Sequence, residues 1–287
     1  MIGILCDSAC DLPSIYLKKN FLEIAPLQVI LNDKSYRDVV EITTPEVIEF
    51  MKKDIPKTSL PSYKDIEEKL NKLVEKGFKK IIALTISSNL SGTHNMFRNV
   101  INDFLKTNKD IEIELIDTLS ISIGSGLILK KAMDMIEDNK SFEEIKNKLN
   151  SIIPNKSRVY YTIPTLKFLK AGGRIGKVSA TIGDFLNIKP VISVNTDGIY
   201  YTVAKGRGMK KSINKMFEVF KEFVSEKTVE SAAVYVSSSD ALTTKLKNEL
   251  IEKVKSIGIN NIIEGTITSA MLVHTGEGLV GMSVIAN

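Results

Sequence analysis

Short apolar runs alternate with amphipathic helical segments through the first half of this chain, and this alternation restricts the fold more than any other feature. The apolar runs predict strands at residues 2–6, 22–31, 81–86 and 111–116. The intervening segments predict helices that begin after Thr43 and that cover 62–76, 95–106 and 123–137. Strands that alternate with helices in this way form a parallel sheet with helices on both faces. We therefore predict a Rossmann-like parallel sheet.

Polar loops follow these predicted strands, at residues 7–11, 87–93 and 117–118. In open α/β sheets, ligands bind beyond the carboxyl ends of the strands. These loops are therefore the first places to look for a functional site.

The pattern changes after Pro154. Residues 188–194 and 199–204 flank an Asn-Thr-Asp-Gly turn and predict a β-hairpin. Further strands are expected at 158–163, 231–236 and 279–285, with helices at 164–170, 209–224 and 240–256. We expect a second α/β domain with antiparallel character, so that residues 1–157 and 158–287 form two domains. A chain of 287 residues fits two domains, at roughly 150 residues each.

Composition excludes several classes of protein. No apolar run approaches the ~18 residues of a membrane-spanning helix, and the start of the chain lacks a secretory signal pattern. The two cysteines, Cys6 and Cys10, cannot build a disulfide framework and fit a reducing cytosol. We therefore expect a cytoplasmic protein without stable membrane insertion. Two histidines are too few for a His-rich zinc site, and we predict no metal and no cofactor.

The net charge of +5 is concentrated in one segment. Residues 158–215 contain 11 basic side chains and two acidic ones, which gives a net charge of +9. Arg174 and Arg207 lie in this segment. A nucleic-acid-binding module would interleave aromatic and basic residues, and no such motif is present. We expect instead one basic face.

The sequence Gly-Gly-Arg-Ile-Gly-Lys-Val-Ser at 172–179 suggests a phosphate-binding P-loop, but its spacing is wrong. That motif needs four residues between the first glycine and Gly-Lys, and Ser or Thr directly after the lysine. Here the gap is three residues and Val178 follows the lysine. The local pattern favours a helix C-cap followed by a glycine turn.

Two hydroxyl-rich loops, at 57–62 and 87–93, each allow two interpretations. Hydroxyls and free amides at a helix N-terminus bind anions, and the helix dipole strengthens the attraction. The same residues also serve as ordinary helix caps. Two such loops at neighbouring strand ends could together hold a carboxylate or a phosphate.

His274 lies between an apolar run and a glycine turn, where glycines permit close approach of the backbone to a ligand. His94 is expected on the surface. A hydrolase would need a nucleophile elbow, and no Gly-x-Ser-x-Gly occurs in the chain. Asp7, Asp11 and Asp117 could serve a metal-dependent phosphotransferase, although capping of turns is the favoured role.

Several of these motifs follow one another in a specific order. The first four are Cys-Asp-Ser-Ala-Cys-Asp-Leu-Pro at 6–13, Lys-Thr-Ser-Leu-Pro-Ser at 57–62, Ser-Ser-Asn-Leu-Ser-Gly-Thr at 87–93 and Ile-Asp-Thr at 116–118. The others are Ile-Pro-Thr-Leu-Lys-Phe-Leu-Lys-Ala-Gly-Gly-Arg-Ile at 163–175, Ile-Lys-Pro-Val at 188–191, Asp-Gly at 197–198 and His-Thr-Gly-Glu-Gly at 274–278. This ordered set resembles the DegV family of bacterial fatty-acid-binding proteins, and the resemblance runs essentially end to end.

The resemblance implies a two-domain α/β carrier that encloses one long-chain fatty acid, such as palmitate, in an apolar tunnel. The carrier presents the acid to a separate fatty-acid kinase, which makes acyl phosphate for phospholipid synthesis. The hydroxyls that would hold the carboxylate correspond to Thr58 and Ser91, with Ser59 and Thr93 adjacent, and the histidine corresponds to His274. Arg174 and Arg207 correspond to the arginines that we expect to dock an acidic rim on the kinase.

Two departures from the family pattern concern the proposed site. Glu277 stands where the family usually has proline, so its charge either weakens carboxylate binding or faces solvent. The first loop has Ala9-Cys10 in place of the common Ser/Thr-Ala, and we assign it no binding role. Four apolar residues either line the tunnel or belong to the ordinary core: Phe168, Ile182, Phe185 and Leu186.

The alternative to a monomeric carrier is an acyl hydrolase or acyltransferase that uses Ser91 and His274.

Overall fold

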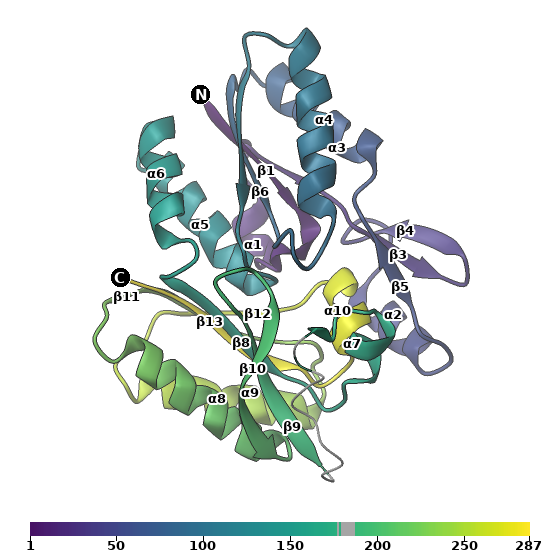
Figure 1. The fold of residues 1–287 in the computed structure, drawn as a ribbon, viewed down its shortest axis with the longest axis vertical. Coiled ribbons are helices and arrows are strands. Elements are labelled where there is room, and N and C mark those ends of the chain that lie inside the picture. Colours follow the sequence, from purple (N-terminus) through teal and green to yellow (C-terminus); the bar gives the residue numbers. More distant parts are fainter. Residues whose placement is uncertain (177, 179–186) are drawn as a thin grey trace.

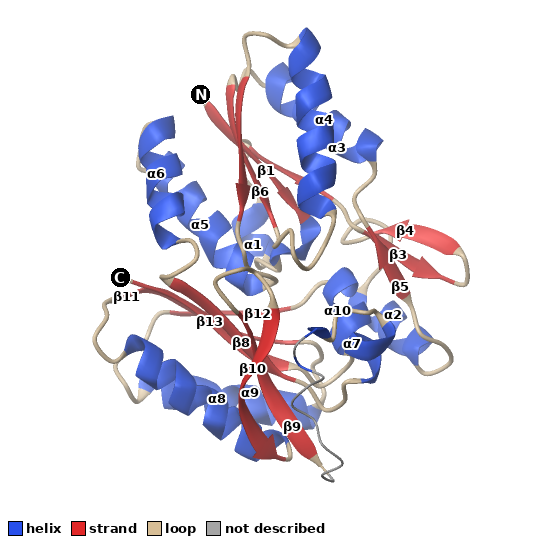
Figure 2. Ribbon diagram, viewed as in Figure 1, coloured by secondary structure: helices blue, strands red, loops and turns tan. Residues whose placement is uncertain are grey.

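A computed structural model of the chain describes residues 1–176, 178 and 187–287. The first sheet is parallel, in the order β2-β1-β6-β7. Its strands are β1 (Ile2–Asp7), β2 (Leu22–Ala25), β6 (Lys80–Thr85) and β7 (Glu112–Asp117). Helices α3 (Tyr63–Glu75) and α4 (Thr93–Thr107) cover one face, while α5 (Ile123–Glu137) and α6 (Phe142–Ile152) lie on the other (Figures 1 and 2). The predicted parallel sheet with helices on both faces is confirmed.

The single strand predicted at residues 22–31 is wrong. The chain leaves the parallel sheet after Ala25, and residues 28–31 form β3 (Gln28–Leu31) of a separate antiparallel sheet. The break falls at Pro26, which has no backbone N–H to donate to a neighbouring strand.

The small antiparallel sheet has the order β4-β3-β5. Its other strands are β4 (Lys34–Arg37) and β5 (Lys57–Ser59), and helix α2 (Thr44–Met51) lies between them in sequence. Residues 57–59, predicted as part of a loop, are therefore a short strand. Along the chain, β1 is followed by the 3-10 turn η1 (Ser8–Cys10) and helix α1 (Ser14–Leu17).

The second half of the chain builds a mixed sheet in the order β10-β9-β8-β13-β11-β12. Its strands are β8 (Ser157–Thr162), β9 (Ile188–Val194), β10 (Tyr200–Arg207), β11 (Val229–Val236), β12 (Ile262–Thr266) and β13 (Val280–Ala286). All described neighbours are antiparallel except β11 and β12, and the predicted hairpin is β9–β10. Helices α8 (Met209–Val224) and α9 (Ala241–Lys255) cover the outer face (Figure 2). The predicted antiparallel character is confirmed.

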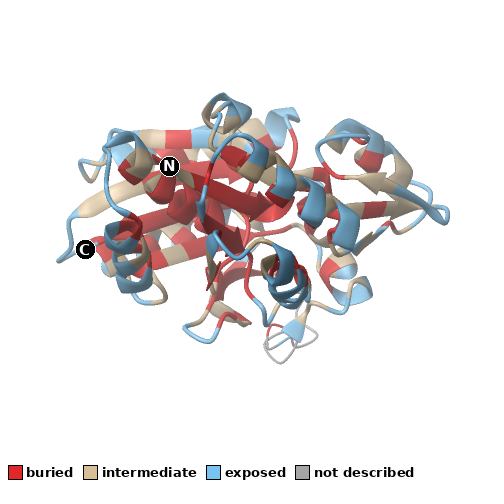
Figure 3. Ribbon diagram, turned by 90° about the horizontal axis from the view of Figure 1, so that it is seen from above, coloured by how far each residue is buried: buried red, intermediate tan, exposed pale blue. Residues whose placement is uncertain are grey.

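Helix α5 lies between the two large sheets. It contacts β1 and β6 of the parallel sheet as well as β8, β11 and β13 of the mixed sheet. Figure 3 shows buried residues gathered on the central strands. One apolar cluster, which includes Ile82, Leu127 and Ile192, joins residues from both sheets. The boundary between two domains at residue 157 stays a prediction.

Two short helices complete the region between the sheets: α7 (Lys167–Ala171) and α10 (Ser269–Thr275). Helix α10 packs against α2, α7, β3 and β5, so it lies beside the small antiparallel sheet although it comes from the end of the chain (Figure 1). The sequence did not predict α10. Nearly all of its residues are buried, so it lacks the polar face that produces a helical period. No described helix is long and apolar enough to cross a membrane.

Candidate functional site

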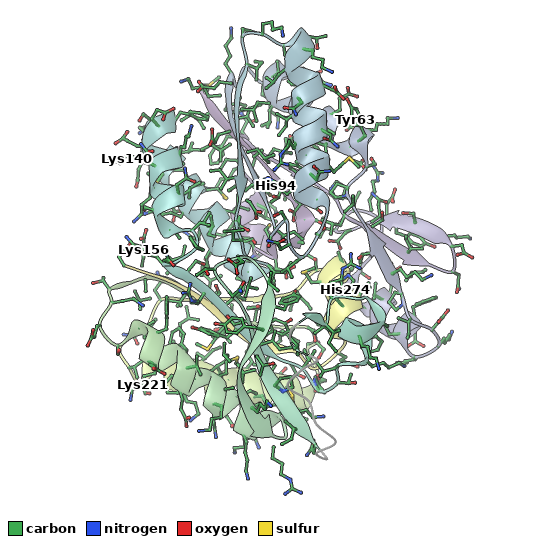
Figure 4. All side chains as sticks on the ribbon, viewed as in Figure 1. Tyr63, His94, Lys140, Lys156, Lys221 and His274 are labelled. Carbon is green, nitrogen blue, oxygen red and sulfur yellow. The ribbon has the colours of Figure 1, made fainter. Side chains whose placement is uncertain are left out.

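The candidate site is centred on a contact between β5 and α10. His274, in the last turn of α10, places Nε2 2.7 Å from the Thr58 hydroxyl oxygen. Figure 4 shows His274 beside the segment that carries β5. Two residues predicted from separate motifs therefore meet in the structure.

His274 is held in its neutral form. Burial, and to a smaller extent the positive charge of Arg174, lowers its pKa to about 4. A neutral imidazole has one N–H donor and one acceptor nitrogen. Nε2 forms a hydrogen bond with the Thr58 hydroxyl, while the buried Nδ1 has no hydrogen-bond partner within the described residues.

Gly172 packs against the ring of His274, where a side chain would not fit. A Cβ atom on Gly172 would lie 2.4 Å from Nδ1 of His274, far inside van der Waals contact. The predicted C-cap is confirmed, because Gly172 caps α7 and Gly173 has a φ of +71°. The local sequence did not indicate the packing role of Gly172, because the histidine comes from a distant part of the chain.

Arg174 follows this glycine pair and points back to it, with Nη1 donating to the carbonyl of Gly172 at 2.5 Å. It is partly buried. Arg207 ends β10 and is exposed. Of the two arginines assigned to partner docking, Arg174 is the one whose positive charge lowers the pKa of His274.

Ser91 and Thr93 form the second part of the site, where the loop after β6 enters α4. The two hydroxyl oxygens are 2.8 Å apart, and the Ser91 oxygen accepts a hydrogen bond from the backbone N–H of Thr93 at 3.2 Å. Gly92 occupies the N-cap position and offers no side-chain cap. Amides in the first turn of a helix lack intrahelical partners and attract anions.

The loop that carries Ser91 adjoins the segment that carries Thr58. A Cβ built on Gly92 would lie 3.5 Å from the two terminal methyl carbons of Leu60, which is ordinary contact distance. Thr58 and Ser91 thus belong to neighbouring segments. Ser59 is exposed, and the alternation of side chains along β5 places it on the opposite face from Thr58.

The tip of the β9–β10 hairpin holds the Ser91 loop from the other side. Ser87 donates its hydroxyl hydrogen to the carbonyl of Gly198 at 2.8 Å, and the Asn89 amide donates to the carbonyl of Asp197 at 2.7 Å. A Cβ on Gly198 would lie 2.1 Å from the Ser87 hydroxyl oxygen. The Asp-Gly motif therefore forms the hairpin turn and also accepts two hydrogen bonds from the Ser91 loop.

The aspartates considered for metal chemistry serve as caps, as favoured from the sequence. Asp7 accepts from the backbone N–H groups of Ala9 and Ile86, and Asp117 accepts from those of Ser88 and Leu119. No group of three or more metal-ligating side chains occurs in the part of the chain that the structure describes.

His94 was expected on the surface, and this prediction is wrong. Its exposed fraction is 6%, and Nδ1 lies 2.9 Å from the hydroxyl oxygen of Thr85 in β6 (Figure 4). The helical face that carries His94 packs on the parallel sheet.

Glu277 is exposed. Phe168 packs against Gly276, while Ile182, Phe185 and Leu186 lie outside the described residues.

Known proteins are similar to this chain along its whole length. The profile of the DegV family, described as an uncharacterised protein family, matches residues 1–287. A DegV domain-containing protein of Clostridium acetobutylicum is 38% identical over 283 residues, which are 99% of this chain and 98% of the relative.

Solved structures are similar in fold as well. A DegV family protein of Thermus thermophilus, described by its fatty acid binding, has a TM-score of 0.89 at 26% identity, with 100% of this chain and 99% of that chain covered. A stearic acid-binding protein of Eubacterium ventriosum has a TM-score of 0.89 at 30% identity, with 100% and 98% covered.

Proposed function

Because this chain belongs to the DegV family, we propose that it is a carrier that binds one long-chain fatty acid and presents it to a separate fatty-acid kinase. The observation that carries the proposal is the hydrogen bond between Thr58 and His274, next to the Ser91 loop. Two solved relatives are described by their fatty acid binding or their stearic acid binding.

The chemistry of the site suits a carboxylate. With Nε2–H of the neutral His274 donating to the Thr58 oxygen, the Thr58 hydroxyl hydrogen is free to donate to the ligand. The Ser91 hydroxyl adds a donor from the adjacent segment, beside the start of α4, where the helix dipole attracts an anion. Hydrogen bonds to an ionised acceptor are stronger than neutral ones.

Neutral donors also limit the cost of desolvation. A buried ion pair removes two charges from water, and its mutual attraction often fails to offset that cost. Here Arg174 supplies positive charge near His274 from a partly buried position. We expect the acyl chain to supply most of the affinity from an apolar tunnel, at about 0.8 kcal/mol per buried CH₂ group.

The hydrolase or acyltransferase alternative needs a serine paired with a histidine base. In the structure, Ser91 pairs with Thr93, whereas His274 pairs with Thr58. A histidine whose pKa is about 4 is a weak base at neutral pH. A time course with a fluorogenic acyl ester tests this alternative: we expect no turnover, and turnover that His274→Ala abolishes would establish an enzyme.

We propose that the kinase docks on the basic segment, through Arg174 and Arg207. The family resemblance supports this step, and the exposure of Arg207 suits it. We assign no nucleic-acid partner, and we place the carrier in the cytoplasm as a monomer.

The docking step is tested by acyl-phosphate formation with ATP and a bacterial fatty-acid kinase. Arg207→Glu is expected to slow the reaction without releasing the fatty acid. Lys221→Glu, an equal charge change on exposed α8, is the matched control (Figure 4). Equal rates for both variants would remove Arg207 from the docking surface.

A further inference from the structure

Helix α10 is held at both ends by residues from the first quarter of the chain. Its last turn carries His274, which contacts Thr58. Its N-cap residue, Thr268, provides no side-chain cap. At 1.5 Å per residue the helix is only about 10 Å long, so a movement of its start is transmitted to His274.

Two aspartates supply the missing cap. Asp11 accepts a hydrogen bond from the backbone N–H of Thr268 at 2.7 Å, and Asp38 accepts one from that of Ala270 at 3.1 Å. The first amides of a helix have no intrahelical acceptor, and the helix dipole favours a negative charge beside them. The carboxyls therefore satisfy two donors that the helix itself leaves open.

Each aspartate is fixed by a further hydrogen bond. Ser8 donates its hydroxyl hydrogen to Asp38 at 2.7 Å, and Ser122 at the start of α5 donates to Asp11. The exposed fractions are 3% for Asp11 and 0% for Asp38. A carboxyl buried to this extent is costly unless hydrogen bonds compensate it. The arrangement thus fixes α10 against both η1 and α5.

We propose that Asp11 and Asp38 are positioning residues for the carboxylate site, because they hold the start of α10 and thereby set His274 against Thr58. The proposal rests on the proposed function for its consequence in ligand binding. Its structural part, the position of His274, is measurable without any ligand.

The test follows His274 by NMR in the full-length protein, where the imidazole signals come from only two histidines. The imidazole signals that disappear in His274→Gln belong to His274, and those that remain belong to His94. In the wild-type protein the His274 ring is expected to be neutral at pH 5.5, because its pKa is about 4. In Asp38→Ala and Asp11→Ala we expect His274 to be displaced. Its pKa should then lie about one unit or more closer to the ordinary value of 6.5 than in the wild-type protein.

Asp240→Ala is the matched control. Asp240 accepts from the N–H of Thr243 at 3.0 Å and from the Ser238 hydroxyl at 2.6 Å, so it caps α9 as Asp38 caps α10. This control should leave the His274 titration unchanged. Asp38→Asn keeps an acceptor for Ala270 and provides the test if Asp38→Ala does not fold; its shift is expected to be smaller and in the same direction.

Fatty-acid retention is measured on the same samples, and we expect Asp38→Ala to lose at least several-fold more ligand than Asp240→Ala. An unchanged His274 titration in folded Asp11 and Asp38 variants would overturn the proposal. If the wild-type protein binds no fatty acid, the proposed function fails, while the titration still decides whether these aspartates position His274.

Discussion

Nε2 of His274 and the hydroxyl oxygen of Thr58 lie 2.7 Å apart, although 216 positions separate the two residues in the sequence. The contact joins α10, at the end of the chain, to β5 in the small antiparallel sheet. It leaves the Thr58 hydroxyl hydrogen available to a ligand when Nε2–H donates. The proposed carboxylate site therefore depends on the correct packing of α10.

Removal of the Thr58 hydroxyl should weaken fatty-acid binding. Thr58→Val keeps the shape of the side chain but removes one of the donors that we propose for the carboxylate. A hydrogen bond to a charged group contributes about 1.5–3 kcal/mol, so we expect the dissociation constant to rise by roughly 10- to 150-fold. Displacement of a fluorescent fatty acid measures the change.

Ser59→Ala is the control for this experiment, because Ser59 is exposed on the opposite face of the same strand. We expect a much smaller effect. Equal losses in the two variants would show that β5 acts through its fold rather than through Thr58.

The contact between Gly172 and His274 predicts a strong coupling between these two positions. Gly172→Ala places a Cβ 2.4 Å from Nδ1, so the imidazole must move away and binding should fall at least tenfold. In a His274→Ala background the same substitution has no ring to displace. Residues in contact couple by about 0.5–3 kcal/mol in such cycles. Additive effects in the double-mutant cycle would refute the contact.

The hairpin tip should support the Ser91 loop. Gly198→Ala introduces a Cβ 2.1 Å from the Ser87 oxygen at a φ of +77°. Gly258→Ala carries a similar backbone penalty, at a φ of +88°, but meets no atom within 4 Å. Thermal unfolding and ligand binding of both variants separate strain from loop displacement, and we expect lost binding only for Gly198→Ala. Comparable binding would exclude a role for the tip.

The pH dependence of stability should carry the signature of His274. Its pKa is about 4 in the folded chain and near 6.5 when unfolded, so the unfolded chain binds more protons between these values. The contribution is fully present above pH 6.5 and is lost as the pH falls towards 4. Burial raises the pKa of Asp7 and Asp11 to about 7, which has the opposite effect.

The comparison of the wild-type protein with His274→Gln removes the contribution of the aspartates, which both proteins share. The stability advantage of the wild type over this variant should shrink as the pH falls from 6.5 to 4. Urea unfolding at several pH values measures it. Parallel stability profiles would contradict a depressed histidine pKa.

Local patterns predicted much of the fold. The apolar runs located the strands of the parallel sheet, and the helix predicted over residues 62–76 is α3, which Ser62 caps by accepting from the N–H of Asp65. The strand predicted at 22–31 failed because a continuous apolar run concealed a change of sheet at Pro26. Buried α10 gave no periodic signal.

The candidate site was predicted residue by residue but not as a geometry. The resemblance pointed to Thr58, Ser91 and His274, yet no local pattern showed that His274 would bond Thr58 or that Gly172 would face its ring. Such contacts depend on how distant elements pack. For the same reason the burial of His94 was missed, since only the packed sheet shows which face of α4 is covered.

The central claim is tested most directly by mass spectrometry of the lipid that accompanies the protein. Protein purified from a bacterial host, denatured and extracted with solvent should yield close to one long-chain fatty acid per chain. Ser91→Ala should retain substantially less of it, while Ser88→Ala, on the same loop and exposed, should match the wild type. Extracts that contain no fatty acid, from wild-type protein shown to be folded, would contradict the account.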